Sequence, residues 1–287
     1  MPVGKILASV TGGVRDAAIL GYAVEAARPF NAHVVAFFVR PDLSQAIAYF
    51  NDGVSGPVVD EVIKASREAA DEAANRIKAT LAAVCDRASA TLVPSPRRAN
   101  AVTLSFHEEQ GNFADQLTDA ARLSDLVVFG PLREGDTVGL AEAFVQVLVE
   151  TDRPVLLATD ATPSSFARRV AIGWDGKNAA SQAVSAAIPY LVKAEHVEIL
   201  SVQRTAKAPA SDALKDYLAL HGVTCSERAI ARKDKSTGEV LLDAARDVAA
   251  DLLIVGGYGH SRFRESLIGG VTRHVLTHAK MPVFMVH

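Results

Sequence analysis

Residues 251–259 read DLLIVGGYG, and nine residues separate Gly259 from a second glycine pair, Gly269-Gly270. An apolar run that ends in glycines predicts a buried strand opening into a tight loop. Glycine permits positive φ, and it lets backbone N–H groups approach phosphate oxygens without a Cβ in the way. Apolar residues recur at helical spacing after the second pair, so free N–H groups at a helix start would also favour an anion. The stretch therefore predicts a site for a phosphorylated small molecule.

Around this stretch, the second half of the chain alternates predicted strands with predicted helices. Ser236 is followed three positions later by Glu239, a capping box that opens one of the helices. Alternation of this kind predicts a parallel sheet with right-handed crossovers and helices on both faces. The predicted strands are residues 170–174, 197–202, 223–231, 252–255 and 282–286, and the predicted helices are residues 179–191, 213–220, 236–248 and 271–279.

The first half repeats this order with a weaker copy of the glycine pattern. Its matching strands are residues 5–10, 32–39, 125–129 and 153–157. Counting along the repeat places Thr11 in the slot of Asp175, Arg133 in the slot of Gly259, and Ala141-Glu142 in the slot of Gly269-Gly270. The first half is therefore predicted not to close a phosphate-binding loop.

Two further features set the domain organisation. The first half carries an insertion at residues 41–56 and a long amphipathic helix at residues 58–84, with one stripe formed by Ile63, Ala70, Ile77 and Leu81. Core packing explains such a stripe, and a groove for a partner is the alternative. Residues 160–166 are polar and rich in turn formers, so they predict a linker between domains at 1–160 and 167–287.

Composition narrows the class of protein. The 287 residues are 49% hydrophobic and 22% charged, enough apolar material for two ordinary cores. A net charge of -3 with interspersed signs provides no basic stripe for nucleic acid. No stretch reads as a signal peptide or a membrane span, so we expect a cytoplasmic protein without membrane contact. Cys85 and Cys225 are isolated in sequence and indicate neither a disulfide framework nor a zinc site.

These motifs resemble the universal stress protein family, and nearly the whole chain resembles two domains of that family in tandem. Gly256, Gly259 and Gly269 match the glycine spacing of the nucleotide-binding members, whereas Gly270 stands where those members have Ser or Thr. The resemblance implies an α/β fold of the adenine nucleotide alpha hydrolase type, with two repeats of a five-stranded parallel sheet in the order 3-2-1-4-5. It also implies ATP or a related adenine nucleotide as ligand, with or without Mg²⁺, and a role in the stress response.

The resemblance assigns further site residues in the second half. It implies an acidic contact at Asp175 and a backbone contact at Val202. Sheet geometry independently favours Asp175, because the loops after strands one and four flank the point where the strand order reverses. An Asx-turn or helix cap is the alternative role for Asp175. Arg262 within the loop could neutralise the phosphates, and a solvated charge that does not reach the ligand is the alternative. Val271 and Thr272 at the helix start complete the predicted phosphate site.

Two classes of function follow from these residues. In the first, the second domain is a nucleotide-responsive module with at most slow hydrolysis, because no Walker lysine, acidic magnesium pair or general base can be named. In the second, the chain is a ligand-free scaffold whose halves form an intramolecular pseudo-dimer through their last strands, with a homodimer of whole chains left open. His274 and His278 have the spacing of a metal pair but no third ligand, so a role at the helix end is favoured.

Overall fold

The computed structural model describes residues 3–42, 56–132, 139–203, 210–232, 234–257 and 270–287. The described strands form one eleven-stranded sheet in the order β3-β4-β2-β1-β5-β6-β11-β10-β7-β8-β9. Each neighbouring pair is parallel except β6 and β11, which run antiparallel. This antiparallel pair joins the first half of the chain (residues 1–160) to the second half (residues 167–287).

The elements of the first half follow the predicted order. The predicted long helix is present and longer than expected at both ends, and a two-residue strand is added at the sheet edge. The elements are β1 (Lys5–Ser9), α1 (Asp16–Ala27), the 3-10 helix η1 (Arg28–Phe30), β2 (His33–Pro41), α3 (Gly56–Ala88), β3 (Thr91–Leu92), β4 (Thr103–Gly111), α4 (Phe113–Ala121), β5 (Leu126–Phe129), α5 (Leu140–Glu150) and β6 (Val155–Leu157).

The second half also follows its prediction, and every boundary lies within one residue of the expected position except the start of the third strand. Val223 was expected in a strand, but its N–H donates to the carbonyl oxygen of Leu218 at 2.9 Å, so it belongs to the turn that ends α7. The elements are β7 (Arg169–Gly173), α6 (Asn178–Leu191), β8 (His196–Gln203), α7 (Asp212–Leu220), β9 (Ser226–Ala231), α8 (Thr237–Asp247), β10 (Leu252–Gly256), α9 (Gly270–His278) and β11 (Val283–Val286).

Each half contains the predicted five strands in the order 3-2-1-4-5. In the first half this order is β4-β2-β1-β5-β6, and in the second half it is β9-β8-β7-β10-β11. The fold is therefore an α/β fold with a mostly parallel sheet covered by helices. In each half the first and fourth strands are neighbours, so the loops at their carboxyl ends meet at the point where the strand order reverses.

The core has one layer on each face of the sheet, and both layers contain residues from both halves. The central strands are buried on both faces, which explains why they read as continuous apolar runs rather than as alternating patterns. Phe129, Phe144 and Phe284 are among the largest fully buried side chains. The two halves therefore share one continuous hydrophobic interior.

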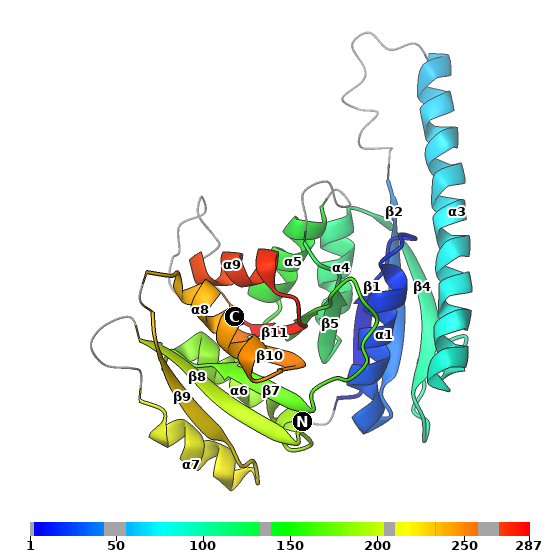
Figure 1. Cartoon of the computed structure of the whole chain (residues 1–287). Helices are drawn as coiled ribbons and strands as arrows, with labels where there is room; N and C mark the ends of the chain where they lie inside the picture. The colour runs from blue at the N-terminus through cyan, green and yellow to red at the C-terminus, as the bar shows by residue number, and fades with distance from the viewer. Residues whose placement is uncertain (1–2, 43–55, 133–138, 204–209, 233, 258–269) are drawn as a thin grey trace.

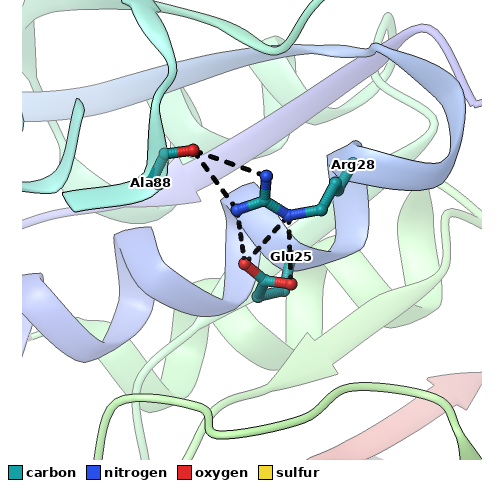
Figure 2. A network of polar contacts seen from close by, with 3 residues as sticks. All are labelled: Glu25, Arg28 and Ala88. Carbon is teal, nitrogen blue, oxygen red and sulfur yellow. Dashed lines mark hydrogen bonds and ion pairs between the residues drawn. The ribbon is translucent and has the colours of Figure 1, made fainter. Parts of the chain in front are cut away.

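Helix α3 lies along the outer edge of the first half (Figure 1). Its apolar stripe packs into the core, since Ile77 and Leu81 are 0% and 1% exposed. Core packing, rather than a partner groove, therefore explains this part of the stripe. The end of α3 is tied to the end of α1: the Arg28 guanidinium donates to the Glu25 carboxylate at 2.8 Å and to the carbonyl oxygen of Ala88 at 3.4 Å (Figure 2).

Tyr190 of α6 is the centre of the contact between the halves. Its ring packs edge-on against Phe30, Phe166 and Phe284, with centroid distances of 5.3, 5.7 and 6.1 Å. Its hydroxyl donates to the carbonyl oxygen of Ala26 at 3.3 Å. These residues come from the first half, the linker and the second half, so one buried side chain links all three.

Candidate functional site

The predicted site lies at the carboxyl ends of β7, β8 and β10. The pairing of β7 with β8 ends at Gly173 and Leu200, and β8 continues through Val202 to its last residue, Gln203. Val202 is 6% exposed and pairs with Ile230 of β9. Val202 therefore lies on β8 beyond the level at which β7 ends. Asp175, in the turn that follows β7, lies at the same edge of the sheet.

Asp175 lies in the turn between β7 and α6 and is exposed. Its Oδ1 accepts a hydrogen bond from the N–H of Lys177 at 3.0 Å, which is an Asx-turn, and Gly176 takes a φ of +73° within it. Asp175 therefore has the Asx-turn role that the sequence offered as the alternative to a ligand contact. One carboxylate oxygen is used in this bond, and the exposed position leaves the other oxygen open to solvent. Beside Asp175, the Trp174 indole N–H donates to the carbonyl oxygen of Ala210 at 3.0 Å.

Gly256 is the last residue of β10 and allows the first turn of α6 to come close. A Cβ at this position would lie 2.6 Å from the backbone nitrogen of Ala180, and no side chain fits there. At the next residue, Gly257, a Cβ would lie 2.9 Å from Cδ2 of Leu148 in α5, a side-chain atom that can shift, so this position is less strictly confined. Packing of α6 thus requires glycine at position 256, and it brings the α6 N-terminus to the end of β10.

Helix α9 begins at Gly270, which is exposed, and among the described residues no atom lies within 4 Å of a Cβ added there. Val271 is half-buried and Thr272 is 7% exposed, so the Thr272 side chain packs beneath the helix. The helix is held by α8, where a Cβ on Gly238 would come within 2.8 Å of the His274 Cβ. The α9 N-terminus therefore combines open space at Gly270 with a fixed helix position.

Three predicted phosphate-binding residues, Gly259, Arg262 and Gly269, lie outside the described residues, as does Arg133 of the first half. Their roles stay predictions. His274 and His278 stack with ring centroids 4.2 Å apart, and His278 Nδ1 lies 3.0 Å from the carbonyl oxygen of His274. Within the described ranges, no group of three His, Cys, Asp or Glu side chains is placed to hold a metal ion.

The corresponding turn of the first half is occupied by its own carboxylate, which sequence reasoning missed. Asp16 is 1% exposed, and it accepts hydrogen bonds from the N–H groups of Thr11 at 3.1 Å and Gly12 at 2.7 Å. Burial raises the pKa of Asp16 to about 6, although the bonds from the turn and the Arg76 guanidinium oppose this shift. The signal available in the sequence was the Gly12-Gly13 turn followed closely by an acidic residue.

The start of α5 also differs from the predicted alignment. The helix begins at Leu140, so Ala141 and Glu142 lie inside its first turn rather than at its start. Gly139 precedes it with a φ of +86° and is the glycine that stands nearest the slot of Gly269. Measured from the matching helix ends, α5 begins two residues before the position that matches Gly270, and the residues that precede Gly270 lie outside the described residues.

Comparison with solved structures defines the class of fold. A universal stress protein from Archaeoglobus fulgidus DSM 4304 aligns over 98% of this chain and 95% of its own, with a TM-score of 0.68 and 14% identity. A putative universal stress protein from Pseudomonas aeruginosa UCBPP-PA14 aligns over 99% and 93%, with a TM-score of 0.54 and 13% identity. These matches show the same fold across both halves.

A family match covers one segment of the chain. Residues 167–287 match the sequence model of the Universal stress protein family. A universal stress protein solved in complex with cAMP aligns over 42% of this chain and 97% of its own, at 26% identity and a TM-score of 0.31. No curated protein matches the chain. Among the described helices, none has the length and apolar character needed to cross a membrane.

Proposed function

We propose that this chain is a tandem universal stress protein, with a first domain at residues 1–160 and a second at residues 167–287. The second domain binds ATP or a related adenine nucleotide, with or without Mg²⁺, as a regulatory ligand in the stress response. Hydrolysis, if it occurs at all, is slow. The phosphates are placed between the glycine loop and the first turn of α9, and the base and ribose are placed between Asp175 and Val202.

The observation that carries this proposal is the family match of residues 167–287 together with its glycine spacing, Gly256, Gly259 and Gly269. The described part of the site agrees with it. Gly270 begins α9 with open space above it, and N–H groups at a helix start favour an anion. The first and fourth strands of the second half are neighbours, and ligands of open α/β sheets bind outside such strand ends.

The test is nucleotide binding by the full chain. We expect the purified protein to retain an adenine nucleotide detectable by mass spectrometry, and calorimetry with ATP to show saturable heat. Gly259→Glu places a carboxylate in the predicted phosphate loop and should abolish both signals. Arg133→Glu also places a carboxylate in the matching slot of the first half and should leave both unchanged. Equal binding by wild type and Gly259→Glu would contradict the proposal.

Gly270 offers a second arm of the same test. Gly270→Ser should fold normally, because a Cβ there meets nothing within 4 Å. The added hydroxyl supplies a hydrogen bond to a charged phosphate, worth about 2 kcal/mol, so the affinity for ATP should rise about ten-fold or more. Gly270→Ala adds the Cβ without the hydroxyl and is the matched control. An affinity that rises equally in both variants would assign the gain to helix stability instead.

A ligand-free scaffold is the second candidate function. The antiparallel pairing of Val155 with Met285, and of Leu157 with Val283, favours it, because this pairing protects the last strand of each half. Packing alone also accounts for Gly256. In this case the two halves form a pseudo-dimer whose nucleotide pocket is no longer used, and wild-type protein shows neither retained nucleotide nor heat with ATP.

A further inference from the structure

A cavity of about 460 Å³ lies in the first half between the sheet and α4. Leu7 of β1 and Val35 and Phe37 of β2 line it on the sheet side, and each is at most 5% exposed. Gln116 of α4 lines the opposite side. The volume falls within the range of small-molecule sites, and an apolar floor beside polar side chains such as Lys5, Ser105 and Gln116 is typical of them.

The matching place in the second half is filled by an ion pair. Pairing with the first strand of each half makes Val35 the counterpart of Glu198, since Leu7 pairs with Val35 and Ala171 pairs with Glu198. Glu198 is 7% exposed and accepts a hydrogen bond from Arg228 Nε at 3.0 Å. A valine cannot form this pair. The cavity therefore exists where the second half has a buried carboxylate and the guanidinium bound to it.

Lys5 brings a positive charge to this cavity. Its counterpart Arg169 is satisfied, because Arg169 Nε donates to the carbonyl oxygen of Val248 at the end of α8, at 3.0 Å. No hydrogen bond or ion pair joins the Lys5 ammonium group to another described residue. The nearby Asp125 carboxylate is held by the backbone N–H groups of Gly4 and Lys5, at 2.8 and 2.9 Å. Burial lowers the pKa of Lys5, and the charge of Asp125 opposes that shift.

A row of buried hydrogen-bonded side chains holds the Ser105 hydroxyl at the cavity lining. Ser105 is 2% exposed, and its Oγ lies 2.9 Å from Nε2 of His33. The His33 Nδ1 lies 2.7 Å from the Thr103 hydroxyl oxygen. Burial, with a smaller contribution from Lys5, lowers the pKa of His33 to about 4, so the ring is neutral at neutral pH. The Ser105 hydroxyl is thus held in place by partners behind the cavity wall.

The acidic side chains at the cavity rim already have partners. Glu109 accepts a hydrogen bond from His107 at 2.8 Å, and Asp119 is paired with Arg122. Within the described ranges, no ion pair joins either carboxylate to Lys5. Lys5 is therefore the charged side chain of the lining that lacks a hydrogen-bond or ion-pair partner among the described residues, and a ligand can supply one.

We propose that this cavity binds a small organic carboxylate with an apolar body. The carboxylate meets the Lys5 ammonium group, and the body packs on Leu7, Val35 and Phe37. Ser105 and Gln116 offer hydrogen bonds to further polar groups of the ligand. This site lies in the half of the chain opposite the proposed nucleotide site and does not depend on it.

The test uses the full chain and three probes: phenylacetate, 4-phenylbutyrate and octanoate. We expect calorimetry or ligand-detected NMR to show that at least one binds, and the neutral amide of that probe should bind about ten-fold more weakly, since a hydrogen bond to a charged group is lost. Lys5→Met should weaken the carboxylate by a similar factor. Arg169→Met alters the matching residue of the second half and should leave binding unchanged.

Two results would overturn the proposal. The first is that no probe binds wild type at millimolar concentration. The second is that Lys5→Met binds the acid as tightly as wild type does and that wild type binds the amide as tightly as the acid. Val35→Glu, which introduces the residue of the second half beside Lys5, should abolish binding. The thermal unfolding midpoint shows whether each variant folds. If Lys5→Met does not fold, Lys5→Gln takes its place in the test.

Discussion

At the scale of single residues, the two halves use the same kind of turn in different ways. In the second half, the turn after β7 contains Asp175, which makes one local hydrogen bond and is exposed. In the first half, the turn after β1 folds around the buried Asp16 carboxylate. The Asp16 carboxylate takes the N–H groups of this turn, so they are not available to an external ligand. Arg76 of α3 reinforces it by donating to the carbonyl oxygen of Gly12 at 2.9 Å.

Asp16 should make stability depend on pH. Its folded pKa of about 6 lies above the ordinary value of 3.8, so the folded state binds the proton more tightly and gains stability as pH falls through this window. Between pH 8 and pH 4, the free energy of unfolding of wild type should rise relative to Asp16→Asn by about 2 kcal/mol. Urea unfolding of both proteins measures this difference. A difference that is constant with pH, or that falls, would contradict a raised pKa.

At the scale of elements, helix ends and close contacts hold the second half in position. Ser236 Oγ accepts a hydrogen bond from the N–H of Glu239 at 3.2 Å, which confirms the predicted cap of α8. Gly238 in the first turn of α8 then lets α9 approach at His274. The start of α8 therefore fixes α9, whose N-terminus belongs to the proposed nucleotide site.

Loss of the α8 cap should be measurable as a change in stability. Ser236→Ala leaves an N–H group of the first turn without its side-chain acceptor and should lower the free energy of unfolding by about 1 kcal/mol. Ser236→Asn retains an acceptor at this position and should cost little. Chemical denaturation of the two variants separates the outcomes. Equal losses in both would show that the side-chain bond does not stabilise the helix.

At the scale of the whole molecule, the two halves are held together by a strand pair and by a buried aromatic cluster. Strands β6 and β11 complete one sheet, and Tyr190 contacts rings from both halves and from the linker. Gly257 adds a close contact with Leu148 of α5. Because the hydrophobic layers are continuous across the junction, we expect the halves to unfold together.

Substitution of Tyr190 should test this junction. Tyr190→Ala removes a ring that is 2% exposed and should lower the free energy of unfolding by about 3–5 kcal/mol. Tyr190→Phe retains the ring and loses only the hydrogen bond to Ala26, which should cost about 1 kcal/mol. Calorimetric unfolding should show one transition in wild type. Two separate transitions in wild type would mean that the halves are independent.

Local sequence patterns were sufficient to predict most of the strands and helices of this protein. The apolar runs at residues 252–255 and 125–129 predict buried parallel strands, and Ser236 predicts a helix start, because each signal depends on residues close together in the chain. The strand order and the location of the candidate nucleotide site at the sheet's reversal point follow from that alternation and from the family resemblance. The roles of Gly259, Arg262 and Gly269 remain predictions from sequence.

Only the tertiary structure decided how the two halves differ. The Asp16 carboxylate in its turn, the close approach of α6 at Gly256, and the cavity beside Lys5 depend on which distant residues meet in space. Val35 in the first half corresponds to the buried Glu198 in the second half. This correspondence can be recognised only from the strand register of the two repeats. Packing and register are long-range properties, and no local pattern of residues encodes them.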